Sequence, residues 1–128
     1  MQYALLIYED ETFWQTASPQ QLGEIMAGYA RFGEEAGERI GGGAALHPTA
    51  TATTVAVRDG ERMLTDGPFA ETREQLGGFY LLEASSLDEA LDLAARIPGA
   101  ATGRIEVRPV MAFNEDGSPV PLTAQAAS

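Results

Sequence analysis

A long amphipathic helix that opens at Ser18 is the feature that most constrains how this chain can fold. Ser18 can cap a helix, Pro19 suits its first turn, and Gln21 completes a capping box. Apolar residues then recur at helical spacing for about five turns: Leu22, Ile25, Met26, Tyr29, Phe32 and Ala36. The helix is predicted to end between Arg39 and Gly43, where glycines gather. Because its apolar face needs cover, a second layer must pack against it.

Strand patterns lie on both sides of this helix and of a second, shorter one. Asp59-Gly60 between two strand-like runs is the strongest hairpin signal in the chain. The second helix is predicted to begin at the capping box in residues 86–89 and to end at Pro98-Gly99. Gly77-Gly78 predicts close backbone packing or a bulge, and the alternative is close approach of a ligand. The strand-like runs are residues 2–9, 43–48, 53–58, 61–65, 78–84 and 104–113.

This order of elements predicts an α+β fold in two layers, with a ferredoxin-like split β-α-β plan and an added β-hairpin. Residues 1–113 form the domain, and residues 114–128 form a C-terminal tail that we expect to be held against a partner subunit. One sheet face carries the helices, whereas the apolar residues of the other face need cover. A second subunit is the simplest cover, so we expect a homodimer with facing sheets.

The composition excludes several classes of function. With no cysteine and no lysine, the chain cannot form disulfides, thiolate metal sites or lysine Schiff bases. Its single histidine, His47, rules out a multi-histidine metal site within one subunit. The net charge of −11 repels nucleic-acid phosphates, and no apolar run approaches the ~20 residues needed to cross a bilayer. We therefore expect a cytoplasmic protein that binds neither nucleic acid nor membranes directly and uses no cofactor or metal.

One polar loop, residues 66–74, carries the densest set of chemical groups. Asp66, Glu71, Arg73 and Glu74 lie there between two strand-like runs, which is a common way to build a site. Asp66 is a candidate general acid or base next to apolar residues, and the alternative is that it caps its own turn. Glu71, Arg73 and Glu74 either orient a polar ligand or form salt bridges that fix the loop.

Other candidates are suggested by their positions in the predicted elements. His47 could exchange protons with Asp66 if the strands bring the two together, or it is a structural or exposed residue. Tyr80 and Arg108 could line the floor of a cleft, or they belong to the core and to ion pairs between strands. Trp14 could cover such a cleft, or it packs on the helix that follows.

The run Asp66-Gly67-Pro68-Phe69-Ala70-Glu71-Thr72-Arg73-Glu74 closely resembles the signature of the DGPF (DGPFAETKE) branch of the YCII-related proteins, with Arg73 in place of its lysine. The resemblance extends over most of residues 1–113. It implies a dimeric α+β barrel of small, cytoplasmic, ferredoxin-like subunits. For the wider group it implies a histidine–aspartate pair near a cleft, and Asp66 matches that aspartate. The histidine of the pair lies on the first helix, where residues 18–39 of this chain contain none.

Two functional hypotheses follow from these residues. The leading one is a YCII-like protein that binds a small polar organic molecule where the loop 66–74 meets the sheet. As an enzyme it would use Asp66 as the base that removes an acidic proton or adds water, and neither reaction needs a cofactor. The alternative is a non-catalytic accessory or regulatory module, because members of the DGPF branch resemble proteins associated with extracytoplasmic-function sigma factors.

Overall fold

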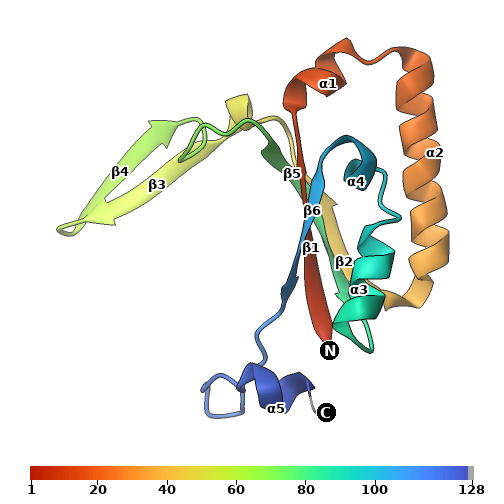
Figure 1. The fold of residues 1–128 in the computed structure, drawn as a ribbon. Helices are drawn as coiled ribbons and strands as arrows, with labels where there is room; N and C mark the ends of the chain where they lie inside the picture. The colour runs from red at the N-terminus through yellow and green to blue at the C-terminus, as the bar shows by residue number, and fades with distance from the viewer. Residues whose placement is uncertain (127–128) are drawn as a thin grey trace.

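The computed structural model describes residues 1–126, in which four strands form an antiparallel sheet with helices on one face (Figure 1). The strand order is β2-β5-β1-β6. These strands are β1 (Gln2–Glu9), β2 (Ile40–Ala45), β5 (Gln75–Glu83) and β6 (Arg104–Pro109). The helices are α1 (Glu11–Thr16), α2 (Pro19–Ala36), α3 (Leu87–Ala94) and α4 (Gly99–Thr102). The predicted α+β class is confirmed.

The long helix α2 begins as its sequence predicts. The Ser18 hydroxyl accepts a hydrogen bond from the Gln21 amide at 3.1 Å, and the Gln21 side chain accepts one from the Ser18 amide at 2.8 Å. The helix ends at Ala36, before the predicted Arg39–Gly43 region. Gly37 adopts a φ of 54°, and a short 3₁₀ turn (Gly37–Arg39) then leads into β2. A left-handed glycine at the helix end therefore stops the helix earlier than the cluster of glycines suggested.

The core lies between the sheet and the helices. Strand β1 alternates strictly, so that Tyr3, Leu5 and Ile7 are buried while their neighbours are only half-buried. Phe32 of α2 and Leu82 of β5 pack in the same cluster, and both are almost fully buried. The other sheet face carries Leu6, Phe79 and Leu81, and no helix covers it (Figure 1). We call it the open sheet face.

Glycines let β2 and β5 approach closely at one edge of the sheet. A Cβ on Gly78 would lie 2.7 Å from the Ala44 carbonyl oxygen, which is too close for any side chain. The pairing of β1 with β5 shifts between Ile7, which opposes Gly78, and Tyr8, which opposes Leu76. Gly77 is the extra residue of that bulge. Both predicted reasons for the glycine pair are therefore confirmed.

The predicted hairpin forms a separate two-stranded sheet of β3 (Thr53–Arg58) and β4 (Glu61–Asp66). Asp59 and Gly60 both adopt positive φ, at 52° and 77°, as a tight hairpin turn requires. Figure 1 shows this hairpin projecting from the body on the side of the sheet opposite the helices. We call residues 53–66 the arm.

Three short helices were not predicted. The segment with Phe13 and Trp14 was expected to be a connection, but it forms α1, whose first turn is capped by the Asp10 carboxylate at 2.9 Å from the Thr12 amide. The helix α4 follows Pro98 directly. In the tail, α5 (Leu122–Ala126) is anchored by the Gln125 side chain, which donates to the Val110 carbonyl at 2.8 Å. Helices of four to six residues are too short to show a periodic pattern.

Two further expectations concern a partner subunit and a membrane. Packing of the tail on a partner stays a prediction, and residues 127–128 of that tail lie outside the described part of the chain. No helix within residues 1–126 is both long and apolar enough to cross a membrane.

Candidate functional site

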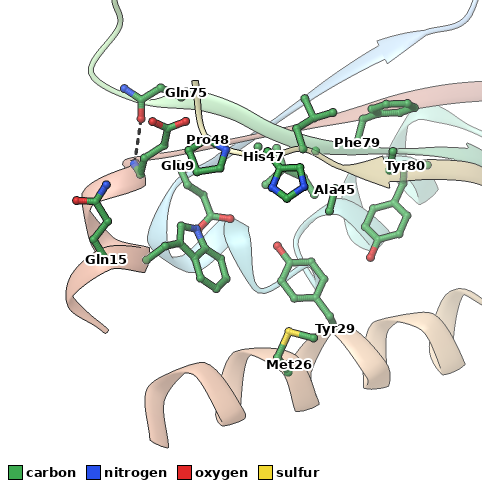
Figure 2. A pocket seen from close by; sticks show the side chains of 18 residues that line it. Glu9, Gln15, Met26, Tyr29, Ala45, His47, Pro48, Gln75, Phe79 and Tyr80 are labelled. Atoms are coloured by element: carbon green, nitrogen blue, oxygen red, sulfur yellow. Dashed lines mark hydrogen bonds between the residues drawn. The ribbon is translucent and has the colours of Figure 1, made fainter. Parts of the chain in front are cut away.

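A cavity of about 780 Å³ lies between the helices α1 and α2 and the edge of the sheet formed by β2 and β5 (Figure 2). Its walls are largely apolar, with Trp14 from α1, Met26 from α2 and the glycine-rich strands opposite. Its polar side chains include Glu9, Tyr29 and His47, and Glu11, Gln15 and Gln75 also line it. A mostly apolar hollow with a few polar groups is the usual form of a small-molecule site.

Glu9 is the one charged side chain that is buried within residues 1–126. As the last residue of β1 it continues the inward-facing row of Tyr3, Leu5 and Ile7, and it is only 8% exposed. The Thr102 hydroxyl donates a hydrogen bond to its Oε2 at 3.2 Å. Burial of a carboxylate is costly unless neighbouring donors stabilise its charge, so these neighbours decide its chemistry.

Gly99 provides the space in which Glu9 and Tyr29 meet. A Cβ at this position would lie 2.9 Å from Glu9 Oε1 and 3.3 Å from the Tyr29 hydroxyl oxygen. Tyr29 comes from the inner face of α2, and Figure 2 shows its hydroxyl pointing into the cavity. Three separate elements, β1, α2 and α4, therefore converge on one carboxylate.

The electrostatics of this cluster favour proton transfer. Burial raises the pKa of Glu9, hydrogen bonds with Thr102 and Tyr29 partly oppose that rise, and the negative charge of Glu74 adds to it. Burial also raises the pKa of Tyr29 well above its usual range, and the nearby Glu9 charge contributes to that rise. Tyr29 is thus a neutral hydrogen-bond donor at neutral pH, next to a carboxyl group that takes up a proton more readily than an exposed one.

The mouth of the cavity is held by hydrogen bonds that tie α1 to two loops. The Glu11 carboxylate accepts from the Thr49 amide at 2.7 Å and from the Thr49 hydroxyl at 2.8 Å. The Glu11 amide in turn donates to Gln75 Oε1 at 3.0 Å, and Gln75 Nε2 donates to the Thr72 carbonyl at 2.6 Å. These bonds fix α1 over the cavity, so Trp14 is held in its wall.

Three of the side chains singled out in the sequence line this cavity: Trp14 of α1, His47 and Tyr80. His47 lies two residues after the end of β2 and is exposed. Tyr80 projects from β5 on the cavity side, with Phe79 on the other (Figure 2). The Tyr80 ring packs on Phe32 with a centroid distance of 5.0 Å, and burial raises its pKa. Tyr80 thus belongs to the core and to the cavity wall at once.

The other candidates lie elsewhere. Arg73 and Glu74 line a second hollow of about 410 Å³ with Asp10 and Arg104, where Arg104 Nε is 3.7 Å from Glu74 Oε1. Three more candidates line neither hollow, namely Asp66, Glu71 and Arg108.

Asp66 is the exposed last residue of β4, at the base of the arm. Within residues 1–126 its carboxylate makes no hydrogen bond or ion pair. The structure therefore does not bring Asp66 to His47 in the cavity of its own chain.

Glu9 and Tyr29 were missed by the sequence analysis. The sequence shows only that Glu9 directly follows an apolar run, and the burial pattern of β1 in the structure is what makes it an inward-facing carboxylate. Tyr29 was assigned only to the apolar face of its helix. Within residues 1–126, no group of three or more His, Cys, Asp or Glu side chains is placed to hold a metal ion.

Comparisons with known proteins place the chain in a family. Residues 1–114 match the model of the YCII-related domain. The chain is 42% identical over 118 residues to the uncharacterized protein R00369 of Rhizobium meliloti (strain 1021), across 88% of this chain and 94% of that protein.

One solved structure is also similar, the 5-chloro-2-hydroxyhydroquinone dehydrochlorinase (TftG) from Burkholderia phenoliruptrix AC1100 in complex with 2,5-dihydroxybenzoquinone. Its TM-score is 0.47 at 15% identity, covering 92% of this chain and 100% of that chain. That likeness is too slight to assign a fold or a reaction. The family match and the close relative show that the chain belongs to the YCII-related family.

Proposed function

We propose that the protein binds a small organic molecule in the cavity between α2 and the sheet, and that Glu9 acts on it as a general acid or base. The observation that carries this proposal is the deep burial of Glu9 in the wall of that cavity, with Tyr29 beside it. Buried carboxyl groups with a raised pKa that line a hollow are candidates for functional sites.

The lining of the cavity favours a mostly apolar ligand with one polar end. Trp14, Met26 and Tyr80 offer apolar contact along its length. At the inner end, Glu9 can accept a proton from an acidic C–H or O–H group or from water. The neutral Tyr29 hydroxyl can donate to the oxygen that gains charge in that step. This is the proton-abstraction or hydration chemistry first predicted for Asp66, with Glu9 as the central group instead.

Several finer predictions remain part of this proposal. The strand order supports a ferredoxin-like split β-α-β plan with the arm as its added hairpin. We further propose a cytoplasmic homodimer of the DGPF branch, in which open sheet faces meet as in a dimeric α+β barrel. Within it, Asp66, Glu71, Arg73 and Arg108 stay candidate site residues, because a partner can supply contacts that one chain lacks.

A neutral fluorescent probe tests the binding part. N-phenyl-1-naphthylamine should brighten when it enters the apolar cavity. Ala45→Trp places a large side chain in the cavity wall and should abolish that signal. Ala101→Trp, on the exposed side of α4, is the matched control and should leave it unchanged. Equal probe binding by all three proteins would refute the assignment of this cavity as the ligand site.

Isotope exchange on simple carbonyl compounds tests the chemistry. When a panel of these compounds is dissolved in D₂O, the protein should speed the exchange of their acidic C–H protons for deuterium. Proton NMR measures this exchange as the loss of the C–H signals. Glu9→Gln keeps the shape of the side chain but cannot take up the proton, so exchange should stop while probe binding persists. If Glu9→Gln exchanges these protons as fast as the wild type, Glu9 is not the base. Absence of exchange with tight probe binding favours the non-catalytic accessory module.

A further inference from the structure

The arm exposes apolar side chains on both of its faces. Val55, Val57 and Leu64 share one face, since Val55 pairs with Leu64 and alternate residues of a strand point the same way. These three are 59%, 60% and 59% exposed, respectively. Met63 is exposed on the opposite face, and Phe69, just beyond the arm, is 90% exposed.

Few contacts within its own chain stabilise this hairpin. An isolated two-stranded hairpin is at best marginally stable in water. The arm is closed at its base by two hydrogen bonds, from the Gly67 amide to the Ala52 carbonyl at 2.7 Å and from the Thr54 hydroxyl to the Gly67 carbonyl at 2.8 Å. Beyond that base, every residue of β4 is exposed. Its regular pairing and its exposed valines and leucine therefore indicate a surface that another body covers.

The arm and the open sheet face border the same space. Figure 1 shows the helices on one side of the four-stranded sheet and the arm extending on the other. Leu6 opposite Phe79 and Ala4 opposite Leu81 form apolar rows on that open face. A single body that lies against the open sheet face would therefore also meet the arm.

We propose that this body is a second copy of the chain and that each arm clasps the other subunit of the dimer. This inference rests on the proposed dimer and adds the element that holds it together. A twofold axis makes the clasp reciprocal, so two arms and two open faces are covered by one interface. The tip of the arm carries both signs of charge. Arg58 lies opposite Glu61 in the strand pairing, and Asp59 and Arg62 are next to them in the sequence. This mixture allows two arms of the same sequence to associate. The net charge of −11 disfavours nucleic acid or an anionic membrane as the occupant.

The clasp also bears on the cavity. The segment that carries the arm leaves the cavity wall after Pro48 and returns to the sheet at Gln75, and both of these residues line the cavity. The two ends of the segment that carries the arm are therefore part of the cavity wall. In this arrangement the loop 66–74 lies where two chains meet, so it can complete a site that neither chain completes alone.

Sedimentation equilibrium of the full chain tests the clasp. Val57→Glu and Leu64→Glu place charges on the apolar face of the arm and should each weaken the dimer by about a hundredfold, because an unpaired charge is buried at the interface. Leu87→Glu is the matched control, since Leu87 is also half-exposed at 49% but lies in the first turn of α3, away from the arm. It should leave the dissociation constant unchanged. Circular dichroism confirms that each variant remains folded.

The outcomes separate the clasp from the proposals on which it rests. A wild-type chain that is monomeric at all concentrations overturns both the dimer and the clasp. A dimer that persists unchanged in both arm variants overturns the clasp and leaves the facing-sheet dimer standing. Hydrogen exchange gives a second readout, because amides of residues 53–66 should lose protection when the dimer is diluted to monomers. Exchange of the arm that is independent of dilution overturns the clasp as well.

Discussion

Replacement of Gly99 by alanine adds a single methyl group at the point where Glu9 and Tyr29 meet. That Cβ would lie 2.9 Å from Glu9 Oε1, 2.9 Å from Ile7 Cγ2 and 3.3 Å from the Tyr29 oxygen. Comfortable separations between such atoms are about 3.5–4.0 Å. At least two neighbours must therefore shift, and one of them is a core side chain of β1.

Overpacking of this kind costs about 1–3 kcal/mol in free energy of unfolding. With an m-value of about 1.5 kcal/mol/M, a loss of about 2 kcal/mol lowers the urea midpoint by about 1 M. The same substitution at Gly23 is the control, because no atom lies within 4 Å of its Cβ position in the interior of α2. There, alanine should stabilise the protein by about 0.5–1 kcal/mol through helix propensity.

Urea unfolding at one fixed protein concentration, followed by Trp14 fluorescence and circular dichroism, measures both variants. Gly99→Ala should also weaken probe binding in the cavity, whereas Gly23→Ala should leave it intact. The two alanine variants should differ in stability by about 2–4 kcal/mol. Equal stability of Gly99→Ala and the wild type would contradict the close packing on which the Glu9 site depends.

Three further predictions concern single positions. Burial raises the pKa of Glu9 in the folded protein. The contribution of the Glu9 side chain to the free energy of unfolding is therefore full below about pH 4.3 and declines as pH rises through that folded-state pKa. Glu9→Gln should remove this decline when unfolding is measured as a function of pH. Ser18→Ala removes the capping box of α2 and should cost about 1 kcal/mol by urea unfolding. Gln20→Ala is the control, because Gln20 is exposed in the same turn and its side chain makes no hydrogen bond within residues 1–126. Phe32→Ala empties a core position that is 1% exposed and should lower stability by about 3–5 kcal/mol in the same assay.

Features set by a few neighbouring residues could be predicted from the sequence. The capping box at Ser18 and Gln21 needs only the local chain, and so does the Asp59-Gly60 turn. The short apolar run in residues 2–9 likewise identified a buried strand, and β1 forms there. The loop 66–74 was correctly predicted to be polar, but its residues carried no information on which groups face a common hollow.

The candidate site depended on contacts between distant segments. Glu9, Tyr29, Gly99 and Thr102 meet only because β1, α2 and α4 pack together, with 93 positions separating Glu9 from Thr102. No local pattern reports such a meeting. The local sequence therefore determined the two main helices, the strands and the hairpin turn, because backbone propensity and capping act over a few neighbouring residues. The tertiary structure alone decided which carboxylate is buried in the cavity and on which side of the sheet the arm projects, because burial and direction arise from packing between elements.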